Sequence, residues 1–344
     1  MVIAPRAAAG RSVSRRTGRI RVLCGDHPVP GRATFDATSG LLRALDRCPD
    51  DATVLFLLSG GASALLAAPA PGLARVDKVA LGRHLLRCGA PIEVMNAVRK
   101  HVSAVKGGRL ALRVAPREVI TLALSDVPGD DLATIGSGPT VADPTTFAEA
   151  LRFLRALRGG KRGIPARILR HLEAGAIGRV DETPAVGDPR LRRSRARVVG
   201  SNATALDAAA AAAAGLGYAV RRRRERLTGE AAACARRLVE RLPRAPRAPT
   251  CVLGGGETVV TAAGSSGVGG RCQEMALAAA PGLAGTGWTM LLAGTDGRDG
   301  TTDAAGAFSD GSTLERAGRG ALDRALREHD SYPLLRRLGD ILRT

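Results

Sequence analysis

The pattern of apolar and polar positions along the chain predicts strands that alternate with helices. Uninterrupted apolar runs at Thr53–Leu58 and Val119–Leu124 are typical of strands in a buried parallel sheet. Segments with a helical period lie at Val76–Cys88 and Pro91–His101. Because strands and helices follow one another in this way, we expect an α/β fold.

The rest of the chain shows the same two periods. Further helices are expected at 38–48, 147–157, 166–174, 203–215 and 229–242, further strands at 20–24, 197–199, 218–224, 251–253 and 289–293, and a basic loop at 6–18. Three prolines at a spacing of three, Pro243, Pro246 and Pro249, indicate a linker. We therefore expect one domain at 1–242, the linker at 243–249 and a second domain at 250–344.

Polar chemistry is most concentrated between Asn96 and Thr140, around the predicted strand 119–124. Two cations and a glycine pair precede this strand, a carboxylate follows it, and a second glycine turn comes next; the residues of interest are Lys106, Arg109, Asp126, Ser137 and Gly138. In open α/β sheets, ligands bind beyond the carboxyl ends of the strands. Glycine amides can hold phosphate oxygens and a strand-end carboxylate can hold Mg²⁺. This stretch therefore suits a phosphorylated ligand and a divalent metal.

A second candidate turn follows the predicted strand 53–58. The sequence Ser59-Gly60-Gly61-Ala62-Ser63 leads from that strand into a helix. Glycine amides and hydroxyls at a helix N-terminus form an anion-binding arrangement, and a tight turn without a ligand is the alternative. His27, in a nearby proline-rich loop, could contact substrate or only hydrogen-bond to backbone.

The second half of the chain also combines glycines with polar side chains. Asn202 begins an alanine-rich helix, so it could hold a ligand hydroxyl or phosphate, or act only as a helix N-cap. Glu257 follows three glycines, and Arg271 ends a glycine/serine loop where its guanidinium could clamp a phosphoryl group. Asp296 lies in an acidic turn that could bind a metal or be solvated.

Composition narrows the class of protein. Hydrophobic residues make up 45% of the chain and aromatic residues 2%, which suits an aliphatic α/β core. The net charge is +19, but only four of the 51 basic residues are lysine. We attribute this bias to overall composition rather than to nucleic-acid binding, because aromatic residues that stack on bases are scarce. The six cysteines form no C-x-x-C pair, so reduced thiols in a cytoplasm are expected. No signal peptide and no membrane span are predicted.

Several common nucleotide-binding motifs are missing from the sequence. The chain has no G-x-x-x-x-G-K-[ST] loop, since the pair Gly160-Lys161 is followed by Arg162. It also lacks a G-x-G-x-x-G turn after a strand and a G-x-S-x-G nucleophile elbow. Nucleotide chemistry here would need a less common cradle.

Taken together, the glycine-rich segments resemble the glycerate 2-kinase family of the MOFRL type, which has a DUF4147-like N-terminal domain followed by a MOFRL domain. The segments that carry the resemblance are GDHPVPG (25–31), LLSGGASALLAAP (57–69), MNAVRKHVSAVKGGRLA (95–111), LSDVPGDDLATIGSGPTVADPTTF (124–147), GSNATALDAA (200–209), GGGETVVT (254–261), GGRCQE (269–274) and AGTDGRDGTTDAAGA (293–307). They span nearly the whole chain.

The resemblance implies a Rossmann-like three-layer large domain and a smaller α/β MOFRL domain, with the active site in the cleft between them. It implies phosphorylation of D-glycerate to 2-phosphoglycerate with ATP and Mg²⁺. Asp126 and Arg271 match active-site positions of the family. Asp126 would be a metal ligand or general base, with Asp296 as a second metal candidate, and Lys106, Arg109 and Arg271 would offset charge on the transferred phosphate.

The remaining candidate residues for binding substrate or nucleotide are Ser59, Gly60, Gly61, Ser63, Arg109, Ser137, Gly138, Asn202 and Glu257. The partners expected are ATP and D-glycerate, without nucleic acid or membrane, and a second copy of the chain is a candidate homodimer partner.

The sequence departs from the family pattern in three places. Members normally begin with a strand and a V-G-A-G-K-A-type turn whose lysine belongs to the active site, and they normally end with a G-P-T-G-T-N-type segment. Neither segment is found, so we expect a chain shortened at both ends. The third departure is Cys272, which stands where Asn is usual. The alternatives to an active kinase are an inactive anion-binding remnant and an NAD(P)H-dependent hydroxypyruvate reductase, although no nicotinamide fingerprint is present.

Overall fold

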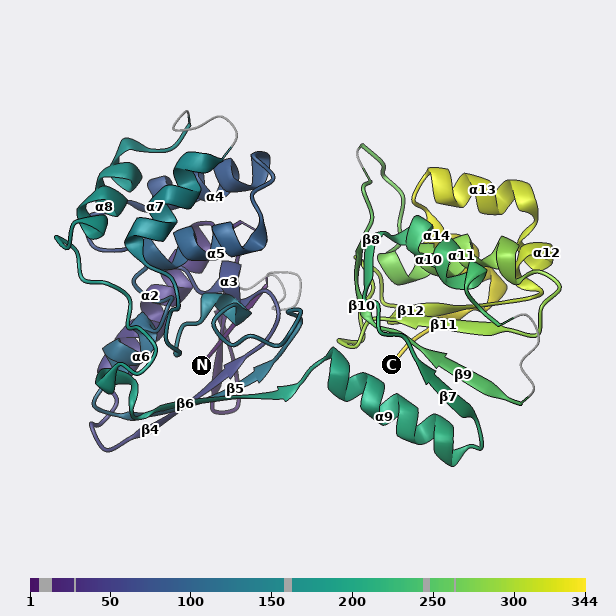
Figure 1. The fold of residues 1–344 in the computed structure, drawn as a ribbon, viewed down its shortest axis with the longest axis horizontal. Helices are drawn as coiled ribbons and strands as arrows, with labels where there is room; N and C mark the ends of the chain where they lie inside the picture. The colour runs from purple at the N-terminus through teal and green to yellow at the C-terminus, as the bar shows by residue number, and fades with distance from the viewer. Residues whose placement is uncertain (6–13, 28, 158–162, 244–247, 263) are drawn as a thin grey trace. The chain divides into compact units, whose positions relative to one another are not determined.

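The computed structural model describes residues 1–5, 14–27, 29–157, 163–243, 248–262 and 264–344. The chain forms two compact units, Met1–Ser201 and Asn202–Thr344. Strands and helices alternate along both units, so the predicted α/β class is confirmed (Figure 1). Residues 244–247 of the predicted linker 243–249 lie outside the described residues, and the predicted domain boundary stays a prediction.

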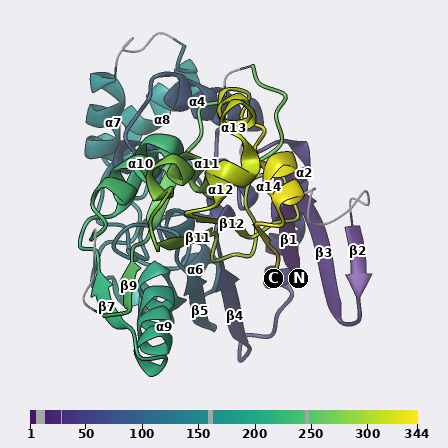
Figure 2. The same ribbon diagram turned by 90° about the vertical axis from the view of Figure 1, so that its right-hand side faces the viewer.

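The described residues of the first unit form two separate three-stranded sheets. The parallel sheet has the order β4–β5–β6, formed by β4 (Thr53–Leu58), β5 (Glu118–Leu124) and β6 (Ser194–Gly200). The mixed sheet has the order β1–β3–β2, formed by β1 (Val2–Pro5), β3 (Ile20–Gly25) and β2 (Ser14–Thr17) (Figure 2). Because β2 pairs antiparallel with β3, the prediction of a basic loop is wrong for residues 14–17; residues 6–13 of that loop lie outside the described residues.

The helices of the first unit lie mainly after β4. They are α2 (Arg32–Asp46), α3 (Ala62–Leu65), α4 (Arg75–Arg87), α5 (Ile92–His101), α6 (Arg109–Val114), α7 (Phe147–Ala156) and α8 (Ala166–Ala176), with short 3₁₀ turns η1 (Ile135–Ser137) and η2 (Pro189–Leu191). Four of them, α4, α5, α7 and α8, share one apolar cluster around Phe147, Leu81 and Leu85, whose side chains are almost fully buried. These helices gather in one part of the unit (Figure 1).

The parallel sheet is buried on one face only. Val119 and Ala123 of β5 are 2% and 0% exposed, whereas Leu55 and Leu57 of β4 are 57% and 69% exposed. The alternation follows from the period of two along a strand. The parallel direction of β4 is as predicted, but its burial on both faces is not observed.

The second unit begins at Asn202 and contains three small sheets. Two are parallel pairs, β7 (Ala219–Arg222) with β9 (Thr250–Leu253) and β8 (Leu227–Glu230) with β10 (Gly256–Val259), and the third is antiparallel with the order β11 (Thr289–Ala293), β12 (Gly306–Asp310), β13 (Ile341–Leu342). Because β7 and β9 pair with each other, strands on both sides of the predicted linker belong to one compact unit.

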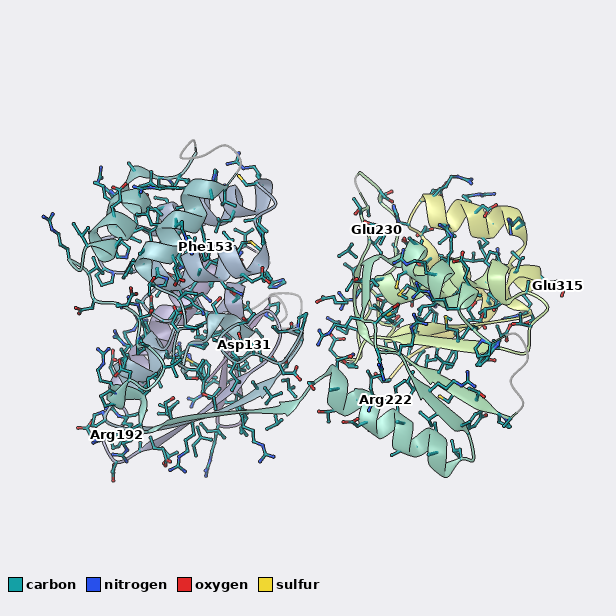
Figure 3. The ribbon with its side chains drawn as sticks, viewed as in Figure 1. Asp131, Phe153, Arg192, Arg222, Glu230 and Glu315 are labelled. Carbon is teal, nitrogen blue, oxygen red and sulfur yellow. The ribbon has the colours of Figure 1, made fainter. Side chains whose placement is uncertain are left out.

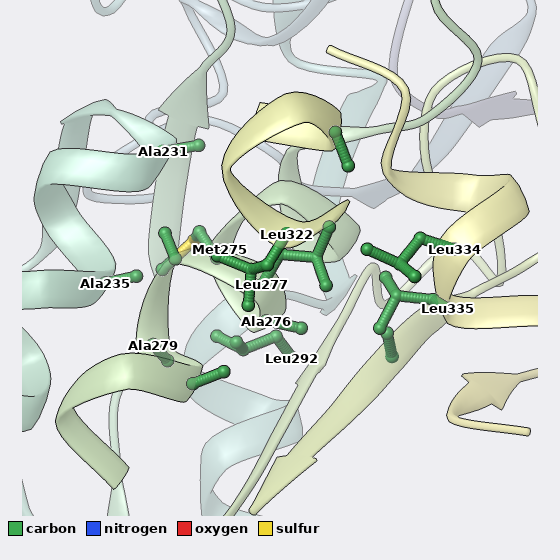
Figure 4. Packing of buried hydrophobic residues seen from close by; sticks show 14 of the residues in the cluster. Ala231, Ala235, Met275, Ala276, Leu277, Ala279, Leu292, Leu322, Leu334 and Leu335 are labelled. Atoms are coloured by element: carbon green, nitrogen blue, oxygen red, sulfur yellow. The ribbon is translucent and has the colours of Figure 1, made fainter. Parts of the chain in front are cut away.

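A helical layer packs on these strands around one core. Its helices are α10 (Ala231–Glu240), α11 (Arg271–Leu283), α12 (Thr313–Ala317), α13 (Arg319–Arg327) and α14 (Ser331–Leu338), whereas α9 (Asn202–Gly215) lies against β7 and β9. The buried cluster centres on α11, where Ala276, Leu277 and Ala279 are fully buried, and it also contains Leu322 and Leu335 (Figure 4). This core anchors α11, and so fixes the position of its first residue, Arg271.

Candidate active site

The carboxyl ends of β4 and β5 bring two turns together in the first unit. The strands pair in register up to Leu58 opposite Ala123, so the turns that follow them are neighbours. A Cβ atom placed on Gly60 would lie 2.7 Å from Asp126 Oδ2, which shows how closely the Asp126 carboxylate approaches the glycine turn. Asp126 is exposed to solvent, as expected of a group that meets a ligand.

The turn at Gly60 and Gly61 keeps the features predicted for anion binding. Neither amide donates to a backbone carbonyl within the described residues. Gly61 has φ of +78°, a conformation that L-residues rarely adopt, and it is the N-cap of α3. The His27 ring lies beside this turn, 3.4 Å from where a Gly61 Cβ would be. The structure therefore places His27 and Asp126 beside the same glycine pair.

The second glycine turn supports the first. Gly136 packs against Leu58, because a Cβ on Gly136 would be 3.1 Å from Leu58 Cδ1. The amides of Ser137 and Gly138 donate to carbonyls of the preceding 3₁₀ turn, at 2.9 and 3.0 Å. These two amides are therefore already used. A binding role for Ser137 and Gly138 stays a prediction, and the geometry gives them a supporting position.

Lys106 joins the two turns from within the protein. Its Nζ donates to the carbonyl oxygens of Ser63, at 2.9 Å, and Gly136, at 3.1 Å, and its side chain is 1% exposed. Burial lowers the pKa of Lys106 well below its usual value, with Lys78 and Arg99 adding repulsion. We predicted Lys106 as a catalytic residue, and this geometry makes it a tether between the turns.

Asn96 and Asp131, which the sequence analysis did not name as site residues, also hold the second glycine turn in place. Ser63 Oγ donates to Ser137 Oγ at 3.0 Å, because the Ser137 hydroxyl itself donates to Asn96 Oδ1 at 3.0 Å. Asp131, labelled in Figure 3, accepts from the Ala133 amide at 3.0 Å and so holds the start of the 3₁₀ turn. The sequence could have indicated Asn96, because it is a polar residue on the apolar face of a helix, and the structure shows that it is buried.

Arg109 points away from these turns. Its Nη2 donates to the Asp181 carbonyl at 2.8 Å. Burial lowers the pKa of Arg109, although Glu182, Asp181 and Asp143 oppose the shift. The structure thus brings Gly60, Gly61 and Asp126 together and does not bring Arg109 to them, and its phosphate-binding role stays a prediction.

One buried ion pair and one partly exposed His–Glu contact hold the C-terminal end of α5. Lys100 Nζ lies 3.0 Å from Asp143 Oδ1, with side chains 4% and 0% exposed. His101 Nε2 lies 2.9 Å from Glu182 Oε1. Burial acts to raise the pKa of Glu182, but hydrogen bonds from His101 and from the Phe147 and Thr183 amides outweigh it, and the net pKa is lowered.

In the second unit, Asp299 occupies the N-terminus of α11. Its Oδ1 accepts from the Cys272 amide at 3.0 Å and its Oδ2 from the Gln273 amide at 2.8 Å, and the residue is 1% exposed. A carboxylate at a helix N-terminus satisfies free amides and the helix dipole. Asp299 therefore caps α11, a structural role that the sequence analysis did not assign to this acidic turn.

The predicted ligand residues of the second unit lie at the start of α11, on β10, at the start of α9 and in the turn after β11. Arg271 Nη1 pairs with Glu257 Oε1 at 2.9 Å, and both side chains are about half exposed. Asn202 lies against Gly255, where a Cβ would be 2.2 Å from Asn202 Oδ1. Asp296 is exposed, and its Oδ1 accepts from the Arg298 amide at 3.2 Å.

The described residues contain no group of three or more potential metal ligands of the types His, Cys, Asp and Glu. Mg²⁺ commonly takes one or two carboxylates together with water and substrate phosphates. The exposed Asp126 carboxylate beside unused amides fits that pattern, because it leaves room for water and phosphate oxygens.

Comparisons with known proteins agree with the geometry. The model of a domain of unknown function, DUF4147, matches residues 1–173, and that of the MOFRL family matches residues 250–344. Glycerate 2-kinase of Pyrococcus horikoshii is 36% identical over 335 residues, which are 95% of this chain and 75% of that protein. The chain belongs to the MOFRL-type glycerate 2-kinase family.

A solved structure of a family member has the same fold. The glycerate kinase of Thermotoga maritima matches with a TM-score of 0.81 and 34% identity over 100% of this chain and 81% of that one. A protein of Agrobacterium vitis named as a putative hydroxypyruvate reductase is 38% identical over 339 residues, 95% of this chain and 74% of its own. Relatives of this chain are therefore named for two different activities.

Within this glycerate 2-kinase family member, Asp126 lies in the first unit and Arg271 in the second. Their predicted meeting at one phosphoryl group stays a prediction. None of the helices that the structure describes combines the length and apolarity of a membrane span.

Proposed function

We propose that this chain transfers the γ-phosphoryl group of ATP to the 2-hydroxyl of D-glycerate, giving 2-phosphoglycerate. The observation that carries the proposal is the Asp126 carboxylate beside the Gly60–Gly61 turn, in a chain of the glycerate 2-kinase family. Unused amides and an exposed carboxylate at the ends of adjacent parallel strands are what a phosphoryl-transfer site needs.

Asp126 acts on the acceptor hydroxyl or holds the metal. A carboxylate within hydrogen-bond reach of the 2-hydroxyl would accept its proton as phosphoryl transfer proceeds. The amides of Gly60 and Gly61 would donate to phosphate oxygens, since they have no backbone acceptor in the described part of the chain. Ser59, which precedes them and is exposed, could add its hydroxyl.

Arg271 supplies positive charge from the second unit. Its pairing with Glu257 holds the guanidinium at the start of α11. A guanidinium placed on the equatorial oxygens stabilises charge in the transition state of phosphoryl transfer. Asn202, at the start of α9, is a further candidate for contact with a ligand hydroxyl or phosphate.

Magnesium fits this arrangement through Asp126, with Asp296 as the second candidate. When bound, the ion would neutralise charge on the nucleotide phosphates. The remaining work falls to the chain itself, because Lys106 fixes the turns and Asp126 and Arg271 provide the polar contacts.

The direct test mixes purified protein with ATP, Mg²⁺ and D-glycerate and follows the product by phosphorus NMR. The proposal expects a signal of 2-phosphoglycerate that depends on both substrates. A signal of 3-phosphoglycerate would contradict the position of transfer, and no phosphorylated product would contradict the activity and favour an anion-binding protein without catalysis.

The reductase name of the Agrobacterium vitis relatives defines the second candidate. It requires oxidation of NADH or NADPH in the presence of hydroxypyruvate, followed at the nicotinamide absorbance. Nicotinamide oxidation by the pure protein, with no ATP-dependent product, would replace the kinase proposal.

A further inference from the structure

Lys78 and Arg99 lie at the C-terminal half of α5, and Lys106 is near enough to both for their charges to repel it. Lys78, from α4, donates from Nζ to the carbonyl of Val102, the C-cap of α5, at 3.3 Å. Lys106 lies beside Ser63 and Gly136, as described above. Arg99 is on α5 itself, three residues before Val102.

Arg99 also shares a face of α5 with the polar network of the glycine turns. Residues three apart on a helix are neighbours on its surface. Arg99 lies three residues after Asn96, and Asn96 Oδ1 accepts a hydrogen bond from Ser137 Oγ at 3.0 Å. The face of α5 that supports the second glycine turn therefore continues through Arg99 to the carbonyl that receives Lys78.

No carboxylate in the described residues balances this cluster, and lowered pKa values reduce the charge of its two lysines near pH 7. Within the described residues, none of the three side chains forms an ion pair with a carboxylate. Burial lowers the pKa of Lys78 to about 7, with repulsion from Arg99 adding to the shift, and burial also lowers the pKa of Arg99. Buried cations are usually paired, because removing an unpaired charge from water is costly.

The cluster has hydrogen-bond donors to spare. The Arg99 side chain makes no hydrogen bond in the part of the chain that the structure describes, although a guanidinium carries five N–H donors. Lys78 uses one of its three on Val102. Lys106 directs its own to Ser63 and Gly136. Arg99 is partly exposed, while Lys78 and Lys106 are 8% and 1% exposed, so a ligand from solvent would meet Arg99 first.

We propose that Lys78, Arg99 and Lys106 form an oxyanion site in which Arg99 contacts a carboxylate or phosphate group of a reactant. The assignment of that oxyanion to a reactant rests on the proposed kinase function. The planar fork of Arg99 can hold two oxygens of such a group at once. Lys78 contributes a hydrogen-bond donor from behind, and Lys106 holds the turns.

The test compares Arg99→Met and Arg99→Lys with Arg83→Met. Arg83 lies on α4, is exposed, and has no ion pair among the described residues, so it is a matched control. We expect Arg99→Met to raise the KM of one reactant by about tenfold to a hundredfold, the usual effect of losing a charge-assisted hydrogen bond. Arg99→Lys should recover part of the affinity, and Arg83→Met should leave both KM values unchanged.

The reactant whose KM changes identifies the source of the oxyanion. A change for D-glycerate alone indicates the substrate carboxylate, and a change for ATP alone indicates a nucleotide phosphate. The Tm of Arg99→Met should not fall, because the substitution removes a poorly solvated charge from a like-charged cluster. Unchanged KM values for both reactants, whatever the Tm, would overturn the proposal.

Direct binding separates this proposal from the kinase proposal. Calorimetric titrations with D-glycerate, a non-hydrolysable ATP analogue and inorganic phosphate need no turnover. If the wild-type protein shows no turnover but binds one of these anions in an Arg99-dependent way, the oxyanion site stands and the kinase proposal falls. If turnover occurs and Arg99→Met binds every anion as the wild type does, the kinase proposal stands and the oxyanion site falls. Failure of the wild type to bind any of the three overturns the site.

Discussion

The Asp126 carboxylate lies so close to Gly60 that a side chain at Gly60 would have to displace it: a Cβ there would lie 2.7 Å from Asp126 Oδ2. This relationship joins the ends of two adjacent parallel strands. Glycine at the first position of the turn pair therefore leaves the Asp126 carboxylate where it is.

Gly60→Ala should therefore displace Asp126. The affected atom is the end of a flexible side chain, so the free energy of unfolding should change by less than about 1 kcal/mol. A misplaced reacting group can lower the rate about a hundredfold, and we expect a kcat loss of that order. Gly82→Ala is the control, because nothing lies within 4 Å of its Cβ position on α4, and it should keep full kcat. Equal kcat values for Gly60→Ala and wild type would contradict the role of this contact.

Asp299 and Asp296 should behave differently on substitution. Asp299→Ala leaves two amides of α11 without an acceptor, so we expect a loss of about 2 kcal/mol or more in the free energy of unfolding. Asp296→Ala removes an exposed side chain and should cost less than about 0.5 kcal/mol. Urea unfolding curves measure both. A greater loss for Asp296→Ala would show that the helix cap is assigned to the wrong residue.

Cys272 should be an unreactive thiol at ordinary pH. Burial and the neighbouring Asp299 raise the pKa of Cys272 to about 12, so its thiolate fraction at pH 9 is about a thousandth. Iodoacetamide labelling followed by peptide mass spectrometry should show a rate that keeps rising above pH 10. The raised pKa also means that Cys272 stabilises the fold fully below its unfolded pKa and ceases to do so as pH rises toward 12. A labelling rate that levels off near pH 9 would contradict this environment.

Glu182 should make stability depend on acid. Its pKa is lowered in the folded protein, despite the opposing effect of burial, by hydrogen bonds from His101 and the Phe147 and Thr183 amides. A lowered pKa contributes stability above the unfolded value, near 4.5, and that contribution is lost as pH falls through the folded pKa. Glu182→Gln should therefore lower Tm at pH 7 and weaken the fall of Tm below pH 4.5. A variant whose Tm curve runs parallel to that of the wild type would rule out this linkage.

Much of the local structure could be predicted from the sequence. The strand at Thr53–Leu58 was predicted with its observed bounds, because an apolar run between polar residues has few alternatives. The helix α2 was predicted from residue 38, but it begins at Arg32 because the Asp26 carboxylate accepts from the Ala33 amide, at 3.1 Å, and provides an early cap. Such a cap acts from seven residues away.

Other elements depend on tertiary partners. Ser14–Thr17 has no apolar pattern and becomes a strand by pairing with β3. Gly229 and Glu230 were predicted as helical, and they are the end of β8 because that strand pairs with β10. Helices α12, α13 and α14 were not predicted, although their amphipathic pattern could have revealed them.

The candidate site also combines features that the local sequence predicts with features that depend on tertiary contacts. Asp126 could be found from its place at a strand end, but its contact with Gly60 depends on the register of β4 and β5. The sequence placed Lys106 and Arg109 together near phosphate, whereas burial turns one toward the glycine turns and the other toward Asp181. The direction of a long side chain is decided by packing, which the local pattern does not contain.

The rate of phosphoryl transfer by Asp126→Asn tests the central claim most directly. Asp51→Asn is the control, because Asp51 is an exposed acid just before β4, at the opposite end of the strand. With saturating ATP, Mg²⁺ and D-glycerate, we expect kcat for 2-phosphoglycerate formation to fall about a hundredfold to ten-thousandfold for Asp126→Asn and to remain at the wild-type value for Asp51→Asn. A wild-type kcat in Asp126→Asn would contradict the account.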